Sequence, residues 1–212
     1  ADLYRWRAAE GEVWAIDADA VSGGRLDPIV TVLDESGRAV LRVRLQAVRD
    51  SYFTFRGKNS EQFNDFRLFN WQEMRLGEYL YAAGEVTRLQ VHPRGPDSGF
   101  NVYPSEGKRW TYFGTSGTTH ALGEPAYVVR PLPAGSEPLA NGLPVFDIVY
   151  ENDDDPQRRA GKNSRLLFTA PEDGRYTVLI EDTRGEGGDQ YGYQLTLRVA
   201  RPSFEVKIDK PK

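Results

Sequence analysis

Apolar and polar residues alternate along much of this chain with a period of two, and this pattern limits the possible folds more than any other feature. The alternation runs through residues 3–7, 13–17, 40–45 and 176–180, and it is longest in residues 191–199. Clusters of Gly, Pro, Asp and Asn separate these segments. Side chains two apart on a strand share one face, so the pattern predicts half-buried strands joined by tight turns. We therefore predict an all-β protein, a β-sandwich of jelly-roll type.

The middle of the chain has a different composition from its two flanks. Residues 49–147 contain 16 of the 25 aromatic residues, together with irregular Pro- and Gly-rich stretches, and helical spacing occurs only at residues 70–80. We interpret 49–147 as a β-rich, irregular insertion between the two halves of a discontinuous sandwich, 1–48 and 148–200. Residues 201–212 begin another alternating segment and are predicted to be a linker or the start of a following domain.

Composition excludes several kinds of chemistry. The chain has no cysteine, which excludes disulfides, thiol nucleophiles and thiolate metal sites. A zinc site would need both histidines, His92 and His120, with carboxylates such as Glu85 or Glu124, and the spacing favours a structural role for these histidines instead. The net charge is −4 without a basic block, so we expect no nucleic-acid partner. No long apolar run predicts a membrane span.

Together, the two flanks resemble the bacterial pre-peptidase C-terminal (PPC) domain family. In the family, the strand and turn that residues 26–37 match are soon followed by an Asn-Asp-Asp loop, whereas here about 100 residues intervene. The segments that carry the resemblance are 11–18, 26–37, 151–155, 163–168, 170–176 and 191–195.

This resemblance implies a jelly-roll sandwich without catalytic activity. Family members usually accompany a secreted protease or another exported catalytic domain, and some of them bind calcium. The expected function is therefore a non-catalytic accessory, adhesion or binding module of a larger exported bacterial protein. The expected location is secreted, cell-surface or periplasmic, and the expected partners are neighbouring domains of the parent chain.

An acidic loop is the densest group of candidate ligands. Residues 151–155 carry four carboxylates in five positions, and Ca²⁺ prefers six to eight oxygen ligands of this kind. Adjacent side chains on an extended chain point in opposite directions, so further ligands would have to come from other turns. The alternative is a solvated acidic turn. The candidate calcium ligands are Asp153, Asp154, Asp155, Asp27, Asp34 and Asp189.

Aromatic residues of the insertion offer a second kind of binding site. Exposed flat rings stack on sugar faces and also anchor protein interfaces, so the ligand could be a polysaccharide or an extracellular protein. The alternative is that the rings form a core for the insertion. A hydrolase of unrecognised type is a third hypothesis, although Ser98 stands fourth rather than third in Gly95–Gly99 and so makes no nucleophile elbow. The candidate ligand-binding rings are Tyr79, Tyr81, Trp110 and Tyr112.

Overall fold

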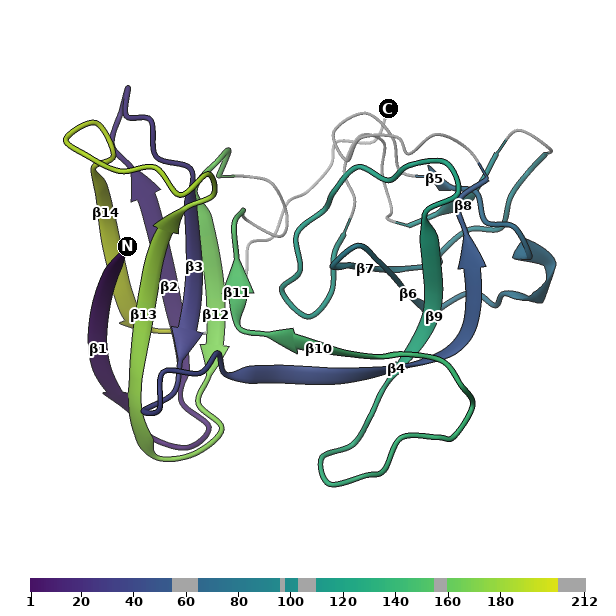
Figure 1. Ribbon diagram of the computed structural model, residues 1–212, viewed down its shortest axis with the longest axis horizontal. Coiled ribbons are helices and arrows are strands. Elements are labelled where there is room, and N and C mark those ends of the chain that lie inside the picture. Colours follow the sequence, from purple (N-terminus) through teal and green to yellow (C-terminus); the bar gives the residue numbers. More distant parts are fainter. Residues whose placement is uncertain (55–64, 96–97, 103–109, 155–159, 202–212) are drawn as a thin grey trace, which may run out of the picture.

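The computed structural model describes residues 1–54, 65–95, 98–102, 110–154 and 160–201. Two β-rich lobes lie side by side along the long axis of the molecule (Figure 1). In the described ranges the one helical element is the 3-10 turn η1 (Trp71–Glu73), inside the segment with helical spacing. The all-β sandwich prediction is confirmed. No helix in this part of the chain has the length and hydropathy needed to cross a membrane.

The first lobe is a sandwich of two antiparallel sheets. One sheet has the order β1 (Asp2–Ala8), β13 (Gly174–Asp182), β3 (Pro28–Leu33) and β11 (Glu151–Asn152). The other has the order β12 (Ser164–Thr169), β2 (Val13–Ala20) and β14 (Tyr193–Val199). The alternating segments 13–17 and 176–180 lie within β2 and β13, and 191–199 supplies β14.

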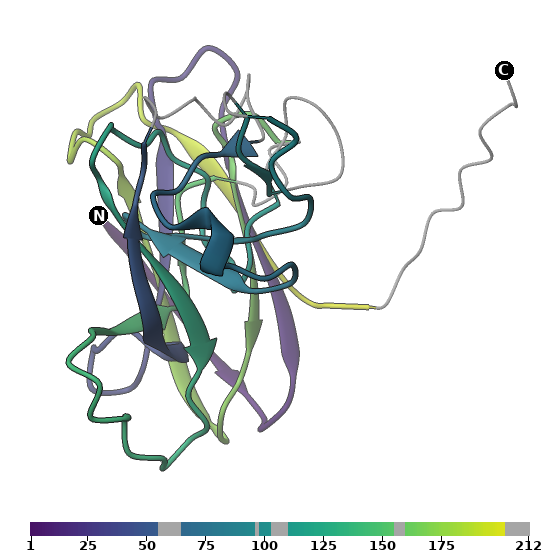
Figure 2. The same cartoon turned by 90° about the vertical axis from the view of Figure 1, so that its right-hand side faces the viewer.

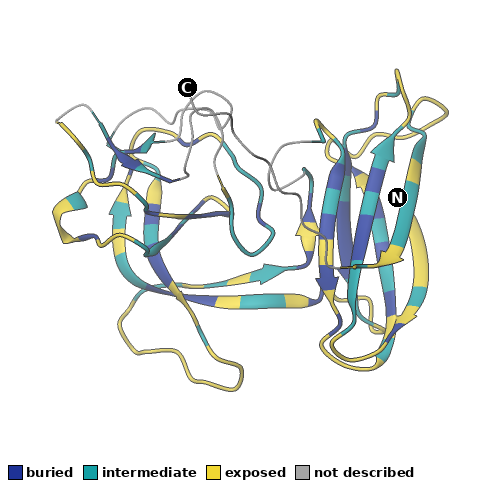
Figure 3. Cartoon of the chain, turned by 180° about the vertical axis from the view of Figure 1, so that it is seen from behind, coloured by how far each residue is buried: buried dark blue, intermediate teal, exposed yellow. Residues whose placement is uncertain are grey.

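The core of the sandwich consists of the apolar side chains on the inward faces of both sheets. Ile16, Val30 and Val178 are fully buried, and the fully buried Phe168 ring meets the Trp6 ring edge-on at 5.7 Å between centroids. Buried positions alternate with more exposed ones along β12 and β13 (Figure 3). This is the pattern that the period of two predicts for a sheet with one face in the core.

The second lobe is built on a curled five-stranded sheet. Its strand order is β10 (Val145–Val149), β4 (Leu41–Tyr52), β9 (Pro125–Pro131), β6 (Tyr79–Ala82) and β7 (Glu85–Arg88). A short ribbon of β5 (Asp65–Phe66) and β8 (Phe100–Asn101) lies beside it. Neighbouring residues of one strand, such as Val128 and Val129, belong to separate buried clusters, so both faces of the sheet are covered.

The change from one lobe to the other lies earlier in the chain than the predicted boundary at residue 48. β4 pairs along its length with β9 and β10 and with no strand of the sandwich. Residues 41–48 and 148–149 therefore belong to the sheet of the second lobe. Alternation at residues 40–45 predicts a strand correctly, but a period of two does not indicate which sheet the strand joins.

The paired antiparallel strands β4 and β10 connect the lobes (Figure 1). Where β4 begins, the Arg42 guanidinium lies over the ring of Tyr150, 5.1 Å from its centroid, and Tyr150 is part of the sandwich core. Burial at this junction lowers the pKa of Arg42 from its ordinary value. Figure 2 views the molecule from the second lobe, with the sandwich behind it.

Candidate functional site

A cleft of about 710 Å³ is lined by residues of both lobes. The sandwich contributes Ile29 and the acidic loop, residues 151–154. The second lobe contributes Tyr81, residues 83–84 of the β6–β7 turn, residues 115–119 and residues 147–149 of β10. The cleft volume falls within the range of about 300–1,000 Å³ that is usual for ligand pockets.

The cleft lining is acidic. Asp147, Glu151, Asp153 and Asp154 contribute to it, and none of the described lining residues is Lys, Arg or His. The Asp147 carboxylate accepts two hydrogen bonds from Arg44, at 2.6 and 2.7 Å, which lower the pKa of Asp147. Arg44 thus pairs with Asp147, and the other carboxylates of the lining lie in residues 151–154.

Asn152 fixes the acidic loop in place. Its side chain is buried, and its Nδ2 donates a 2.6 Å hydrogen bond to the carbonyl of Gly114 in the second lobe. Its Oδ1 accepts a 2.7 Å bond from the backbone N–H of Asp154, and its own carbonyl accepts a bond from the Ser164 hydroxyl. Gly114 has a φ of +71°, which favours glycine. Asn152 therefore holds the two walls of the cleft together.

Behind the opposite wall, a histidine is buried between two glutamates. His120 Nε2 lies 2.7 Å from Glu85 Oε2, and His120 Nδ1 lies 2.8 Å from Glu124 Oε1. The imidazole is fully buried and stacks on Phe53 at 4.6 Å between ring centroids. The imidazole therefore joins the two glutamate side chains through its two ring nitrogens.

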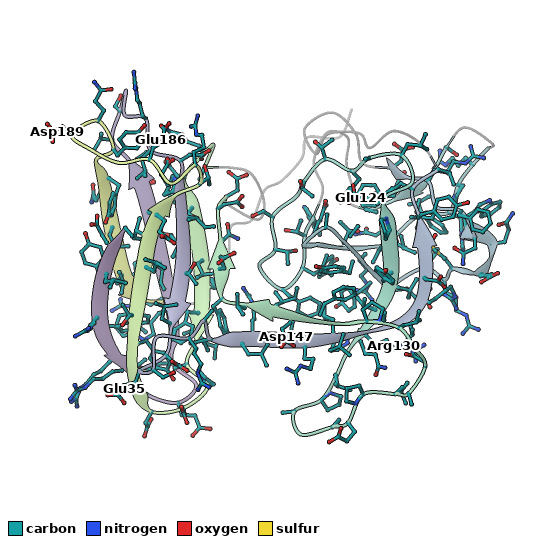
Figure 4. All side chains as sticks on the ribbon, in the orientation of Figure 1. Glu35, Glu124, Arg130, Asp147, Glu186 and Asp189 are labelled. Carbon is teal, nitrogen blue, oxygen red and sulfur yellow. The ribbon has the colours of Figure 1, made fainter. Side chains whose placement is uncertain are left out.

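The two glutamates also hold the backbone of the cleft wall. Glu85 Oε2 accepts a 3.0 Å hydrogen bond from the N–H of Thr118, and Glu124 Oε2 accepts a 2.7 Å bond from the N–H of Ala121. Figure 4 labels Glu124 in the second lobe, on the side of β9. The Glu85–His120–Glu124 group thus links β7 to the loop that includes residues 115–119.

The two histidines are not brought into one metal site. His92 is exposed and packs against the Phe100 ring at 5.4 Å, whereas both nitrogens of His120 are bonded to glutamates. The described residues contain no group of three or more His, Asp or Glu side chains arranged to hold a metal ion. The carboxylates named for zinc, Glu85 and Glu124, do meet His120, but as hydrogen-bond partners.

The five candidate calcium ligands that the structure describes do not meet at one place. Asp153 and Asp154 line the cleft, and Asp155 lies outside the described residues. Asp34 accepts hydrogen bonds from Ser36 and from the backbone of Arg38 in its own turn. Asp27 contacts Thr183 at the end of β13. Asp189 lies at the end of the sandwich opposite to Glu35, the neighbour of Asp34 (Figure 4).

Of the four candidate aromatic ligands, Tyr81 alone lines the cleft. It stacks on Phe146 with ring centroids 3.8 Å apart. Tyr79 and Tyr112 pack against each other at 5.2 Å within the second lobe, as expected if the insertion's rings form its core. Trp110 is half exposed and does not contribute to the cleft.

Comparison of the chain with family models, curated proteins and solved structures gives no match. The resemblance to PPC domains therefore stays a prediction. The cleft geometry is the basis for a functional proposal.

Proposed function

We propose that this chain is a non-catalytic binding module whose ligand occupies the cleft between its two lobes. The observation that carries the proposal is the cleft itself, about 710 Å³ in volume and lined from both lobes by carboxylates and hydroxyls without a described cation. In keeping with the resemblance to PPC domains, the module would serve a larger exported protein, beside that protein's other domains.

The charge of the lining favours a cationic ligand. Glu151, Asp153 and Asp154 lie within four residues of one another and line the cleft, and Arg44 pairs with the more distant Asp147. A cation about 4 Å from one carboxylate gains about 1 kcal/mol in water and more where water is excluded. An anionic ligand would be repelled by the same groups.

Calcium binding by the acidic loop remains a prediction. Asp153 and Asp154 line the cleft, whereas Asp27, Asp34 and Asp189 lie in other turns of the sandwich. A calcium ion at the loop would therefore take its remaining oxygen ligands from groups other than these three aspartates.

Binding of cationic probes to matched variants tests the proposal. Spermine and a pool of lysine-containing peptides would be titrated into the wild-type chain and into Asp153→Asn/Asp154→Asn. The control Glu35→Gln/Asp189→Asn removes the same charge at positions outside the cleft (Figure 4). We expect the affinity of the cleft variant to fall by at least about tenfold and the control to bind like the wild type. Equal binding by all three proteins would refute the proposal.

Carbohydrate binding is a second candidate function, and the position of Tyr81 favours it. The ring lies in the cleft beside the hydroxyl-bearing loop 115–119, and sugar recognition commonly combines one flat ring with hydroxyl and carboxylate partners. A glycan array with the wild-type chain, Tyr81→Ala and the control Tyr52→Ala tests it. Loss of glycan signal in Tyr81→Ala alone would support carbohydrate binding, and no glycan signal in any of the three would contradict it.

A further inference from the structure

β10 is an edge strand, and its outward backbone groups can be identified. It stands first in the order of the five-stranded sheet and pairs only with β4. In an antiparallel pair, successive residues direct their N–H and C=O groups alternately toward and away from the partner strand. The carbonyl of Pro144 accepts a bond from the N–H of Ala47, so Val145 and Asp147 direct theirs away from β4.

The same alternation continues past a bulge. The register shifts between Ile148 and Val149, and the N–H of Tyr150 then donates to the carbonyl of Val40. Val149 therefore also directs its backbone groups outward. Among the described residues, no hydrogen bond is formed to the outward N–H and C=O groups of Val145, Asp147 or Val149. Asp147 and Val149 line the cleft.

The other edge of this sheet is already covered. The carbonyl of Val86 in β7 accepts a 2.8 Å bond from the N–H of Tyr112, and the N–H of Val86 donates to the Thr115 hydroxyl at 3.0 Å. In the ribbon, β10 runs beside β4 toward β11 (Figure 1). Among the described strands of the curled sheet, β10 thus provides the edge that remains open to a new strand.

We propose that the cleft binds an extended peptide, which adds as a strand to the free edge of β10 and places basic side chains against the acidic loop. This inference rests on the proposed function and names the class of its ligand. Strand addition supplies affinity through main-chain hydrogen bonds, and the surrounding side chains supply specificity. Here the charge of Glu151, Asp153 and Asp154 selects a basic peptide over a neutral or acidic one.

The dimensions and charges of the edge fit this occupant. β10 has five residues, so at about 3.3 Å per residue it offers about 16 Å of edge. Alternate side chains of an added strand would point to the same side, so basic residues are expected at every second position. Pairing with a second copy of this chain through the same edge is the alternative occupation, and sedimentation distinguishes it from peptide binding.

Backbone methylation of the peptide separates strand addition from simple charge attraction. The probe is a pool of acetylated hexapeptides with lysine at alternate positions and valine, threonine or tyrosine between them, followed by fluorescence anisotropy with the full chain. The tightest member is then resynthesised with N-methyl groups that remove alternate backbone donors and keep every side chain. We expect methylation to weaken binding about tenfold or more, because two or three hydrogen bonds are lost.

A proline on the edge provides the matching test on the protein. Asp147→Pro removes an outward N–H, a position at which edge strands tolerate proline, whereas Asp147→Asn removes the carboxylate and keeps the donor. We expect Asp147→Pro to bind the peptide about tenfold more weakly than Asp147→Asn. If Asp147→Pro does not fold, the methylated peptide on the wild-type chain decides the question.

The possible outcomes separate this inference from the proposed function. Equal affinity for methylated and unmethylated peptides would overturn strand addition. Spermine or glycan binding that depends on Asp153 and Asp154, without peptide binding, would overturn the peptide inference and leave the cleft as the ligand site. Peptide-induced dimers in sedimentation would show that a second copy occupies the edge and would also overturn the inference. Ligand binding insensitive to Asp153→Asn/Asp154→Asn would refute both.

Discussion

Replacing His120 with phenylalanine tests the buried Glu85–His120–Glu124 group directly. The substitution keeps an aromatic ring of similar size against Phe53, whose ring stacks on His120 at 4.6 Å. It removes both ring nitrogens, including Nε2, which lies 2.7 Å from Glu85 Oε2. The main change is therefore in hydrogen bonding, with little change in packed volume.

The magnitude follows from burial. The side chains of His120 and Glu85 are 0% and 1% exposed, so the Glu85 side chain cannot turn to water when the imidazole is lost. Leaving a buried polar group without its hydrogen-bond partner costs about 1–3 kcal/mol, and more for a charged group. For a chain of this length, a cost of about 3 kcal/mol corresponds to a fall in Tm of about 10 °C.

Thermal and urea unfolding of four proteins would measure this effect. Glu85→Gln/His120→Phe removes the buried charge together with its partner and should recover about half of the lost stability. Glu124 is 19% exposed, so Glu124→Gln should cost less than His120→Phe. A His120→Phe variant within about 1 kcal/mol of the wild type would refute the claim that the hydrogen bonds of His120 hold this wall of the cleft.

Three further substitutions test other parts of the structure. Asn152→Asp replaces the Nδ2 donor that joins the lobes with a carboxylate oxygen, which the Gly114 carbonyl repels. We expect the free energy of unfolding in urea to fall by about 1–3 kcal/mol, and wild-type stability would contradict the assigned hydrogen bond. A neighbouring serine hydroxyl holds the pKa of Asp34 at about 2, so its stabilising effect exists above pH 4 and fades toward pH 2. The Tm difference between the wild type and Asp34→Asn should therefore shrink as the pH falls from 4 to 2. A Tm difference that stays constant over this pH range would contradict the lowered pKa of Asp34. Gly99→Ala would place a Cβ 2.2 Å from the backbone of Phe66 and should cost about 3 kcal/mol, while Gly187→Ala, with open space around it, should cost little.

The sandwich could be predicted from sequence because its signals are local. Alternation at residues 13–17 and 176–180 places apolar side chains on one face, and these segments form β2 and β13. Turn residues between them mark where each strand ends. The sheet that residues 40–45 join could not be predicted in the same way, since their partners in β10 are more than 100 residues away in the chain.

The cleft and its supporting groups depend on contacts between distant segments. The acidic loop was visible in the sequence, but its role depends on Asn152 meeting Gly114, 38 residues earlier. His120 lies four residues from Glu124, and such a short separation could suggest a contact between them. Glu85 lies 35 residues away from His120, and a separation of that length does not suggest one. Tyr81 could not be distinguished from Tyr79 because both have the same alternation, and only the curl of the sheet places one of them in the cleft.

Hydrogen exchange with and without a bound ligand tests the central claim most directly. The chain would be exchanged alone and with the tightest-binding lysine hexapeptide, and the amides protected by the peptide would be mapped. Occupation of the cleft predicts added protection at residues 115–119 and 145–154, including the outward amides of Asp147 and Val149. Protection confined to residues outside the cleft, such as the exposed Tyr52–Phe69 ring pair or the free edge of β1, would contradict it.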